Sequence, residues 1–291
     1  VSGVVCDDIQ DIIVADNKIE SSKGPADGIY LGDINDYQIT GNTINVGDYG
    51  IYVSDGNDGY VPSQRSAVIN NMVISTTDYG IYLTNFEYTD VFHNTAMGEP
   101  AMAINDQVSV DIRNNIFTSL GDHAFYSLDP LATGDSVNYN VYYSGTAIPF
   151  DIGPDDFADL AGWISSDPVR NKNSSYGNPI FLASTDLHVL VSAEANEMGD
   201  PSVGVTVDID GETRSATTPD IGADEFVPAN CFPSTNLTSY EATGSSVKLN
   251  WTPGSGSDFN IEYGAPGFTP GTGAGIIVSN VGMPPYELTG L

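Results

Sequence analysis

Residues Tyr37-Gln38-Ile39-Thr40-Gly41-Asn42-Thr43-Ile44, followed by Gly50-Ile51-Tyr52, form one unit of a repeat in the first half of the chain. An alternating run of polar and apolar residues leads to an Asn, and a Gly-Ile-Tyr segment follows. Alternation with period two, rich in β-branched and aromatic residues and bounded by Gly and Asn, is typical of short β-strands. The unit therefore predicts a pair of strands joined at a corner.

The Asn of this unit recurs at a nearly constant interval. Its matched positions are Asn17, Asn42, Asn71, Asn94, Asn115 and Asn140. The intervals are 25, 29, 23, 21 and 25 residues, and self-similarity at such a period is the mark of a solenoid. No helical stripe occurs before Asp155, which disfavours a leucine-rich repeat. We therefore expect a parallel β-helix, in which each coil pairs with its neighbours.

The same geometry accounts for the choice of Asn. Residues at one corner of successive coils lie on top of each other, so their amides can hydrogen-bond along the stack. Asn also tolerates the left-handed backbone that a tight corner needs. A simpler alternative is that these residues only form turns. Both interpretations predict a structural role.

With this pattern of I-x-x-N-x-I followed by G-I-Y-V, residues 1–150 resemble the right-handed parallel β-helices of the pectate-lyase-like superfamily. Lyases, hydrolases, epimerases, phage tailspikes and adhesins share this fold, so the resemblance implies a fold and no single activity. We expect an all-β chain whose repeats occupy residues 1–153.

The region 154–226 is expected to be a helix and a cap. Residues 154–166 have the apolar spacing of a helix, which we place across or beside the open end of the solenoid. Phrases such as Asn178-Pro179-Ile180-Phe181 and Asp220-Ile221-Gly222-Ala223-Asp224 resemble the terminal segment that follows β-helices in surface proteins of the Bacteroidetes type.

Residues 227–230 are a short linker, and residues 231–291 resemble the start of a fibronectin type III domain. The matching segments are 247–251, with its Trp, 259–263 and 286–291. The last two strands of that sandwich are missing, so we expect the protein to continue beyond Leu291. Cys6 and Cys231 fall in different modules, and we expect no disulfide between them.

Composition restricts the partners. The 291 residues include 8 Lys or Arg and 39 Asp or Glu, for a net charge of −31. Such a charge argues against binding nucleic acid or an anionic membrane surface, and the chain has no apolar run long enough to insert into a membrane. Acidic sugars would need a bridging cation. The composition suits a secreted or cell-surface protein that binds calcium.

Two acidic segments are candidate calcium sites, because carboxylate and carbonyl oxygens suit this hard cation. The first is the loop with Asp55, Asn57 and Asp58, for which an ordinary surface turn is the alternative. The second contains Asp208 and Asp210 near Arg214. Its alternative is an ion-paired set of turns that fixes the cap.

Three tyrosines occupy the same place in successive units: Tyr30, Tyr52 and Tyr82. In Gly-Ile-Tyr the Ile and Tyr side chains point to opposite faces. If Ile fills the core, the tyrosines form an outer row, and such rows bind sugar rings by stacking. The alternative is that Tyr favours strands and covers a neighbouring loop.

Catalytic residues are harder to find. The Gly-His-Gly and Arg-Ile-Lys phrases of polygalacturonase-like hydrolases are absent from the sequence. A lyase needs a base near an acidified proton. Arg113, Lys18 or His123 could serve, and Arg113 and His123 are the candidates. None of the three is tied by spacing to a pair of carboxylates.

These observations favour a modular extracellular or cell-surface protein that adheres to polysaccharide or other surface glycans through its β-helix face. The alternatives are a carbohydrate-active enzyme, as a polysaccharide lyase or glycoside hydrolase, and a structural stalk that spaces further domains of the same chain.

Overall fold

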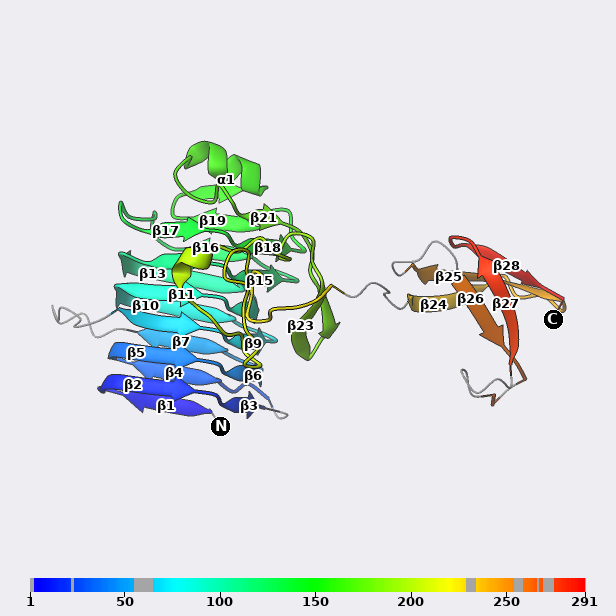
Figure 1. Cartoon of the computed structure of the whole chain (residues 1–291), viewed down its shortest axis with the longest axis horizontal. Helices are drawn as coiled ribbons and strands as arrows, with labels where there is room; N and C mark the ends of the chain where they lie inside the picture. The colour runs from blue at the N-terminus through cyan, green and yellow to red at the C-terminus, as the bar shows by residue number, and fades with distance from the viewer. Residues whose placement is uncertain are drawn as a thin grey trace. The chain divides into compact units, whose positions relative to one another are not determined.

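The computed structural model describes residues 3–21, 24–54, 65–228, 234–253, 259–265, 267–268 and 275–290. The chain divides into two compact units, residues 1–228 and 229–291. Figure 1 shows the first unit as a stack of coils coloured from blue to green.

Three sheets run along the first unit, and the chain passes through them in the same order in each coil (Figure 1). Sheet A contains β1 (Val4–Asp7), β4 (Ile29–Gly32), β7 (Ile51–Ser54), β10 (Ile81–Glu87), β13 (Met102–Val108), β16 (Phe125–Ser127), β19 (Phe150–Ile152) and β20 (Asp155–Phe157). Sheet B contains β2 (Gln10–Ala15), β5 (Asn35–Thr40), β8 (Ser66–Ile69), β11 (Thr89–Phe92), β14 (Asp111–Arg113) and β17 (Ser136–Asn138). Sheet C contains β3 (Lys18–Glu20), β6 (Thr43–Val46), β9 (Met72–Ser75), β12 (Thr95–Met97), β15 (Ile116–Ser119), β18 (Val141–Ser144) and β21 (Ser175–Tyr176).

Each strand pairs in parallel with its equivalent one coil later, apart from the antiparallel pair β19–β20. The predicted parallel β-helix is confirmed. Its core follows from the alternation along the strands, because the Ile of each Gly-Ile-Tyr points inward. Along sheet A one inward column is formed by Ile29, Ile51, Ile81, Met102, Phe125 and Phe150, all fully buried.

The six matched asparagines form one hydrogen-bonded column at the corner between sheets B and C. The amide of Asn71 donates to Oδ1 of Asn94 at 2.9 Å, and that of Asn94 donates to Oδ1 of Asn115 at 2.9 Å. Equivalent bonds of 2.9–3.0 Å link the remaining members. In the five members after Asn17, Oδ1 also accepts the backbone N–H of the Asn in the preceding coil. The column thus satisfies buried backbone groups that no strand pairing reaches.

The left-handed residue of this corner is not the ladder Asn itself. It is the residue before it, as in Asn70, His93 and Asn114, with φ of 54°, 52° and 61°. The ladder side chain must point inward along the stack, so the reversal of chain direction is made one residue earlier. The expected left-handed role of the ladder asparagines is therefore corrected.

The helix is shorter than expected. Helix α1 spans Leu160–Ser166, and residues 155–157 form β20 instead of its first turn. Asp159 ends the extended segment and caps α1, because its carboxylate accepts the Gly162 N–H at 2.7 Å. Leu160 and Trp163 join the solenoid core, so α1 covers its C-terminal end.

Residues 178–226, which we call the return segment, lie on the outer face of sheet C rather than over the end of the solenoid. They include β22 (Ile180–Ala183), β23 (Asp186–Val191) and the 3₁₀ turn η1 (Pro201–Val203). Several outward residues of sheet C are apolar and pack against this segment in two clusters, one around Ile116 and Val141 and one around Met72 and Ile74. An apolar outer face needs cover from water, which explains the difference from the expected cap.

The second unit contains two small antiparallel sheets. One consists of β24 (Thr235–Tyr240), β25 (Ser246–Thr252) and β28 (Tyr286–Thr289), and the other of β26 (Phe259–Tyr263) and β27 (Ile276–Val281). The Trp251 ring is buried and lies 5.5 Å from the ring of Phe259. This unit is all-β, and its assignment to the fibronectin type III class stays a prediction.

Candidate functional site

The three predicted tyrosines lie side by side on the outside of sheet A. Strand register pairs Tyr52 with Tyr30 on one side and with Tyr82 on the other. The rings of Tyr30 and Tyr52 are stacked with centroids 4.5 Å apart, while Tyr52 and Tyr82 meet edge to face at 5.6 Å. All three side chains are half-buried, so the row is both supported and accessible.

A second row of tyrosines lies beside the first at the corner between sheets C and A. The ring of Tyr79 is 4.7 Å from that of Tyr82, and the ring of Tyr49 is 5.3 Å from that of Tyr52. Tyr49 and Tyr79 also stack on each other at 5.6 Å. We call the tyrosine face the set formed by Tyr30, Tyr49, Tyr52, Tyr79, Tyr82 and Tyr126, the last extending the first row beyond Ala103.

Sequence reasoning missed this second row, although a signal for it exists. The phrase Asp-Tyr-Gly-Ile-Tyr occurs at residues 48–52 and again at 78–82, and residues 122–126 read Asp-His-Ala-Phe-Tyr. Only the stacking of coils shows that the aromatic residue before the strand and the Tyr within it share one surface.

The same phrase places a carboxylate at the edge of the tyrosine face in several coils. Asp78 and Asp122 each precede an aromatic residue, and each carboxylate accepts that residue's backbone N–H, at 2.9 and 2.8 Å. Serine hydroxyls hold the corner, since Ser75 Oγ donates to the carbonyl of Asp48 at 2.6 Å and accepts the N–H of Asp78 at 3.1 Å. Hydrogen bonds within each corner thus fix the position of these acids.

The pKa values of Asp78 and Tyr49 at this edge are raised. Burial raises the pKa of Asp78, and the hydrogen bond and negative charge of Asp48 raise it further. Burial likewise raises the pKa of the Tyr49 phenol to about 12, with the charge of Asp78 as the next cause. The Tyr49 phenol therefore stays a neutral hydrogen-bond donor beside the carboxylates of this edge.

The two candidate catalytic residues lie in different places. Arg113 in β14 forms ion pairs with Asp111 at 2.6 Å and with Asp200 of the return segment at 2.8 Å. Burial opposes its charge, but these two carboxylates raise its pKa overall, so it is fixed as a cation and fastens the return segment. His123 pairs with Asp122 and lies 5.9 Å from the ring of Tyr126, at the edge of the tyrosine face.

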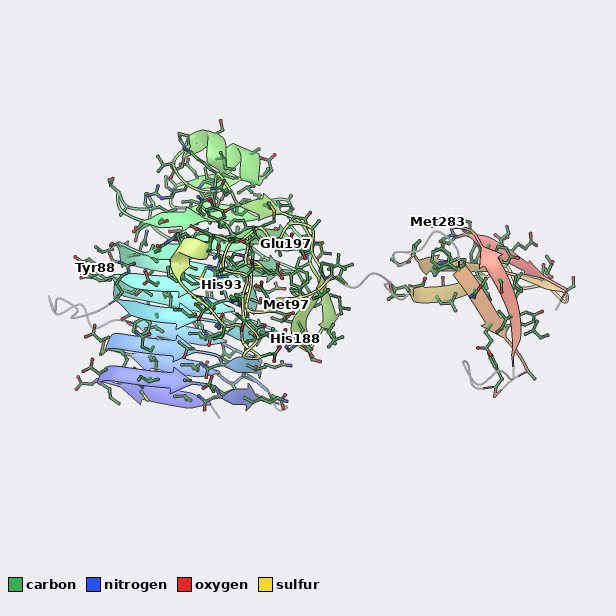
Figure 2. All side chains as sticks on the ribbon, in the orientation of Figure 1. Tyr88, His93, Met97, His188, Glu197 and Met283 are labelled. Carbon is green, nitrogen blue, oxygen red and sulfur yellow. The ribbon has the colours of Figure 1, made fainter. Side chains whose placement is uncertain are left out.

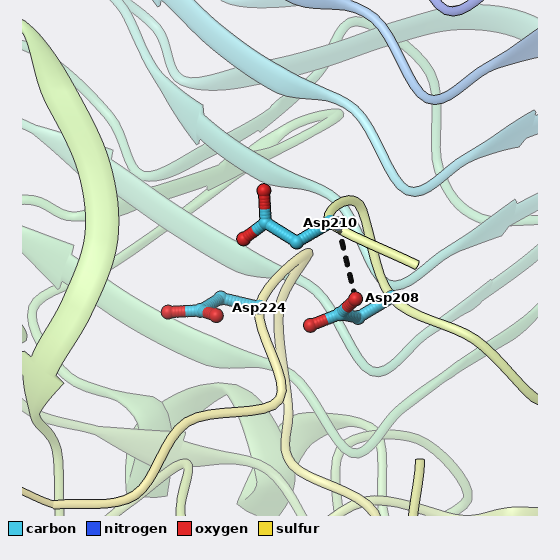
Figure 3. Close-up of side chains that lie close together, drawn as sticks. All are labelled: Asp208, Asp210 and Asp224. Atoms are coloured by element: carbon cyan, nitrogen blue, oxygen red, sulfur yellow. Dashed lines mark hydrogen bonds between the residues drawn. The ribbon is translucent and has the colours of Figure 1, made fainter. Parts of the chain in front are cut away.

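Asp208 and Asp210 come together with Asp224, which sequence reasoning had not included (Figure 3). One oxygen from each of these carboxylates lies within 4.8 Å of the others. Asp208 already accepts the backbone N–H groups of Asp210 at 3.0 Å, Glu212 at 2.7 Å and Glu225 at 3.0 Å. The other predicted calcium site, with Asp55, Asn57 and Asp58, lies outside the described residues.

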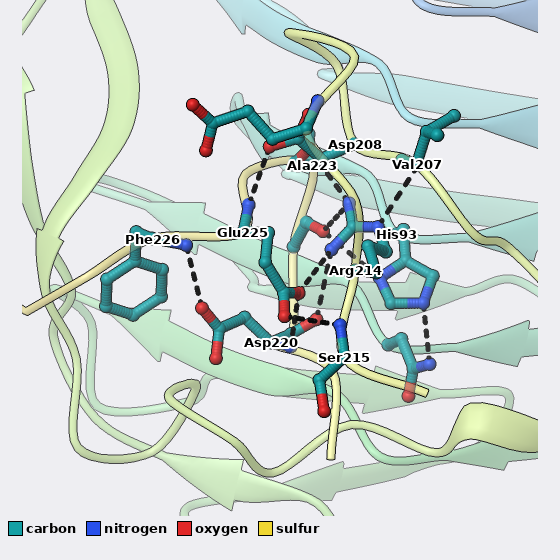
Figure 4. A network of polar contacts seen from close by, with 12 residues as sticks. His93, Val207, Asp208, Arg214, Ser215, Asp220, Ala223, Glu225 and Phe226 are labelled. Carbon is teal, nitrogen blue, oxygen red and sulfur yellow. Dashed lines mark hydrogen bonds and ion pairs between the residues drawn. The ribbon is translucent and has the colours of Figure 1, made fainter. Parts of the chain in front are cut away.

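Arg214 is the centre of the network that holds the return segment (Figure 4). Its guanidinium donates to the carbonyls of Gly222 and Ala223 at 2.9 Å and to Oδ1 of Asn70 at 3.1 Å, and it pairs with Glu225 at 3.4 Å. Gly222 has a φ of +105°, and a Cβ there would lie 2.7 Å from Ile116 of sheet C. The close approach explains why this position is glycine.

His93 is fully buried where the return segment crosses the solenoid (Figure 2). Its Nδ1 lies 3.2 Å from the Gly222 carbonyl, and its Nε2 lies 2.9 Å from the amide nitrogen of Asn114. Burial, together with the charge of Arg214, holds the pKa of His93 well below its usual value. Both nitrogens of this imidazole serve the packing of the segment.

The first unit is thus a parallel β-helix with a covered side and a tyrosine-lined face. A family model described as "Periplasmic copper-binding protein (NosD)" matches residues 1–143, and this family is one of right-handed parallel β-helices. No curated protein and no solved structure matches the chain at a significant level. Neither helix in the described part of the chain is long and apolar enough to cross a membrane.

Proposed function

We propose that this protein works outside the cytoplasm, as a secreted or cell-surface modular protein that adheres to polysaccharide through the tyrosine face. The observation that carries this proposal is the set of six half-buried tyrosines that four coils of the solenoid bring together on one surface. Tyrosine rings offer apolar contact area to sugar rings, and their hydroxyls offer polar contacts at the rim. Similarity to a periplasmic family supports the extracytoplasmic location.

A second candidate function is cleavage of a glycan by the acids of the same face. Asp48 and Asp78 adjoin each other, and the pKa of Asp78 is raised by burial and by Asp48, as in the acid of a glycoside hydrolase. A lyase has less support, because Arg113 is committed to two carboxylates. Release of new reducing ends from any bound polysaccharide would favour the hydrolase.

The family description names copper, so the potential ligands bear on this proposal. Copper prefers imidazole, thiolate and thioether ligands. Among the described residues, the one group of three close carboxylate, imidazole or thiolate ligands consists of aspartates alone. His93 is enclosed by its own hydrogen bonds, and His188 is bonded to Asp186 and Asp210. This donor set does not fit copper, whereas calcium at Asp208 and Asp210 stays a prediction.

The adhesion proposal is tested with the double variant Tyr79→Ala/Tyr82→Ala. We expect it to lose about tenfold in affinity for the polysaccharide that the natural protein binds, about 1.4 kcal/mol. Affinity electrophoresis or pull-down on insoluble glycans measures this loss. Tyr240→Ala is the matched control, because Tyr240 is an exposed tyrosine of the second unit. Unchanged binding by the double variant would rule out the tyrosine face as the adhesive surface.

A further inference from the structure

The charges around the tyrosine face indicate which polysaccharide it takes, an inference that rests on the proposed function. The corner between sheets C and A carries an acid in successive coils: Asp48, Asp78, Glu99 and Asp122. Beyond Tyr126 the strand register continues the tyrosine row with Asp151. One edge and one end of the face are therefore lined by carboxylates.

These acids stand close to each other, and in the described part of the chain none of them pairs with a Lys or Arg. Equivalent positions in adjacent coils are about 4.8 Å apart, and like charges at that distance repel. The ion pairs between described residues engage neither Asp48, nor Asp78, nor Glu99, and at Asp122 the partner is His123. An approaching cation would relieve this repulsion.

The tyrosine rings add a second attraction of the same sign. The face of an aromatic ring carries negative charge density and attracts ammonium groups within about 6 Å of the ring centre. Tyr49 and Tyr79 immediately follow Asp48 and Asp78 in the chain. A cation at this corner therefore meets a carboxylate and a ring together, whereas a uronic acid meets only like charge.

We propose that the tyrosine face selects a polysaccharide that carries protonated primary amines, such as a polymer of unacetylated glucosamine. The sugar rings contact the tyrosines, and the ammonium groups lie beside Asp48 and Asp78. Because the acid and the aromatic residue recur in neighbouring coils, several sugars of one chain bind at once, and the effective concentration strengthens each further contact.

The decisive experiment compares one polymer in two chemical states. Highly deacetylated chitosan and the same chains after N-acetylation are presented to the natural protein in mildly acidic buffer. We expect acetylation to weaken binding at least tenfold, and added salt to weaken the binding of the amine form only. Equal binding of both forms would overturn the inference and leave the proposed function standing. If neither form binds, the tyrosine face does not bind a glucosamine polymer, and the inference is wrong.

Variants separate recognition at this corner from attraction of any polycation by a chain of net charge −31. Asp48→Asn/Asp78→Asn keeps the shape and removes two charges, and we expect it to lose the preference for the amine form. Asp33→Asn/Asp106→Asn removes two exposed charges away from this corner, one just after β4 and one within β13, and Asn suits the positive φ of both residues. This control should keep the preference, and equal losses in both variants would contradict the proposal.

Polylysine provides the last arm of the test. It carries the amines without the sugar rings, so in Tyr79→Ala/Tyr82→Ala it loses only the attraction between ammonium groups and rings. Chitosan also loses the contacts with its sugar rings, so its binding should fall at least tenfold and clearly more than that of polylysine. Equal losses for both polymers would mean that the face binds peptides as well as glycans, and would overturn the selection of an amine-bearing sugar. Circular dichroism establishes that each variant is folded.

Discussion

At the scale of single residues, the asparagine ladder shows why an amide is needed at this corner. Asn94 donates to the Val68 carbonyl at 2.7 Å and to Asn115, while its Oδ1 accepts both the backbone and the side-chain N–H of Asn71. A carboxylate can accept but not donate, and a hydroxyl is too short to reach both neighbours. The amide alone makes every bond.

Replacing Asn94 should therefore be costly. In Asn94→Ala the buried N–H of Asn71 and the amide oxygen of Asn115 each lose a partner, and each such loss costs about 1–3 kcal/mol. We expect the free energy of unfolding, measured with urea, to fall by about 3 kcal/mol or more. Asn17→Ala, at the exposed first position of the ladder, should cost about 1 kcal/mol or less. Similar losses at both positions would show that the ladder bonds contribute little.

His93 should make stability depend on pH. Its pKa is depressed in the folded state by burial and by Arg214, so below the usual value of about 6.5 the unfolded chain binds a proton that the folded chain does not. Stability is complete above that pH and falls as the pH drops, by up to about 1.4 kcal/mol per unit.

The comparison uses His93→Asn, since Asn70 and Asn114 occupy the same left-handed position in neighbouring coils. Urea unfolding at about pH 7.5 and about pH 5.5 should show a drop that is larger in the natural protein by about 1.4 kcal/mol. Burial raises the pKa of Asp220 to about 6, so this group stabilises the fold as the pH drops, opposite to His93. Asp220 is present in both proteins, so its contribution cancels in the comparison. Identical pH profiles would mean that folding does not change the pKa of His93, and would contradict this prediction.

At the scale of elements, the return segment shows how one long excursion of the chain completes a surface. Sheet C has apolar residues on both faces, so it cannot be an outer wall without cover. The segment has little regular structure of its own, and buried polar bonds take the place of strand pairing. Arg214 and Arg113 are two of the side chains that join it to the coils.

Arg214→Met should loosen this segment without unwinding the coils. The substitution removes the cation that pairs with Glu225 and the donor to the carbonyls of Gly222 and Ala223, and breaking a buried pair in this way costs about 3–5 kcal/mol. Hydrogen exchange should then rise in residues 178–226 and stay low in sheet B. Arg65→Met is the control, because Arg65 pairs with Asp90 at a more exposed position. Uniform loss of protection along the chain would contradict a separate role for the segment.

At the scale of the whole molecule, the two compact units should behave as separate folding domains. Calorimetry of the full chain should show two transitions, and the glycan should raise only the one that belongs to residues 1–228. At a ligand concentration of 100 times Kd the added stability is about 2.7 kcal/mol. A shift of both transitions would place part of the binding surface in the second unit.

Much of the solenoid can be read from the sequence, because its signals are local and repeated. Inward Ile51 and outward Tyr52 follow from alternation along a strand, and the interval between Asn42 and Asn71 sets the length of a coil. Each coil presents the same pattern, so a strand boundary that is misplaced in one unit can be corrected by comparison with the next unit. The shortened helix is an exception, since one capping residue, Asp159, set its start.

The remaining features depend on contacts between distant parts of the chain. His93 contacts Gly222, 129 residues later, and the sequence around either residue does not predict this contact. Arg113 was a candidate base from its residue type. Its ion pair with Asp200 instead links the coils to the return segment. The carboxylates and rings of the tyrosine face are local in sequence, but their repulsion and their shared surface arise only when the coils stack, because stacking brings residues 20–30 positions apart to about 4.8 Å.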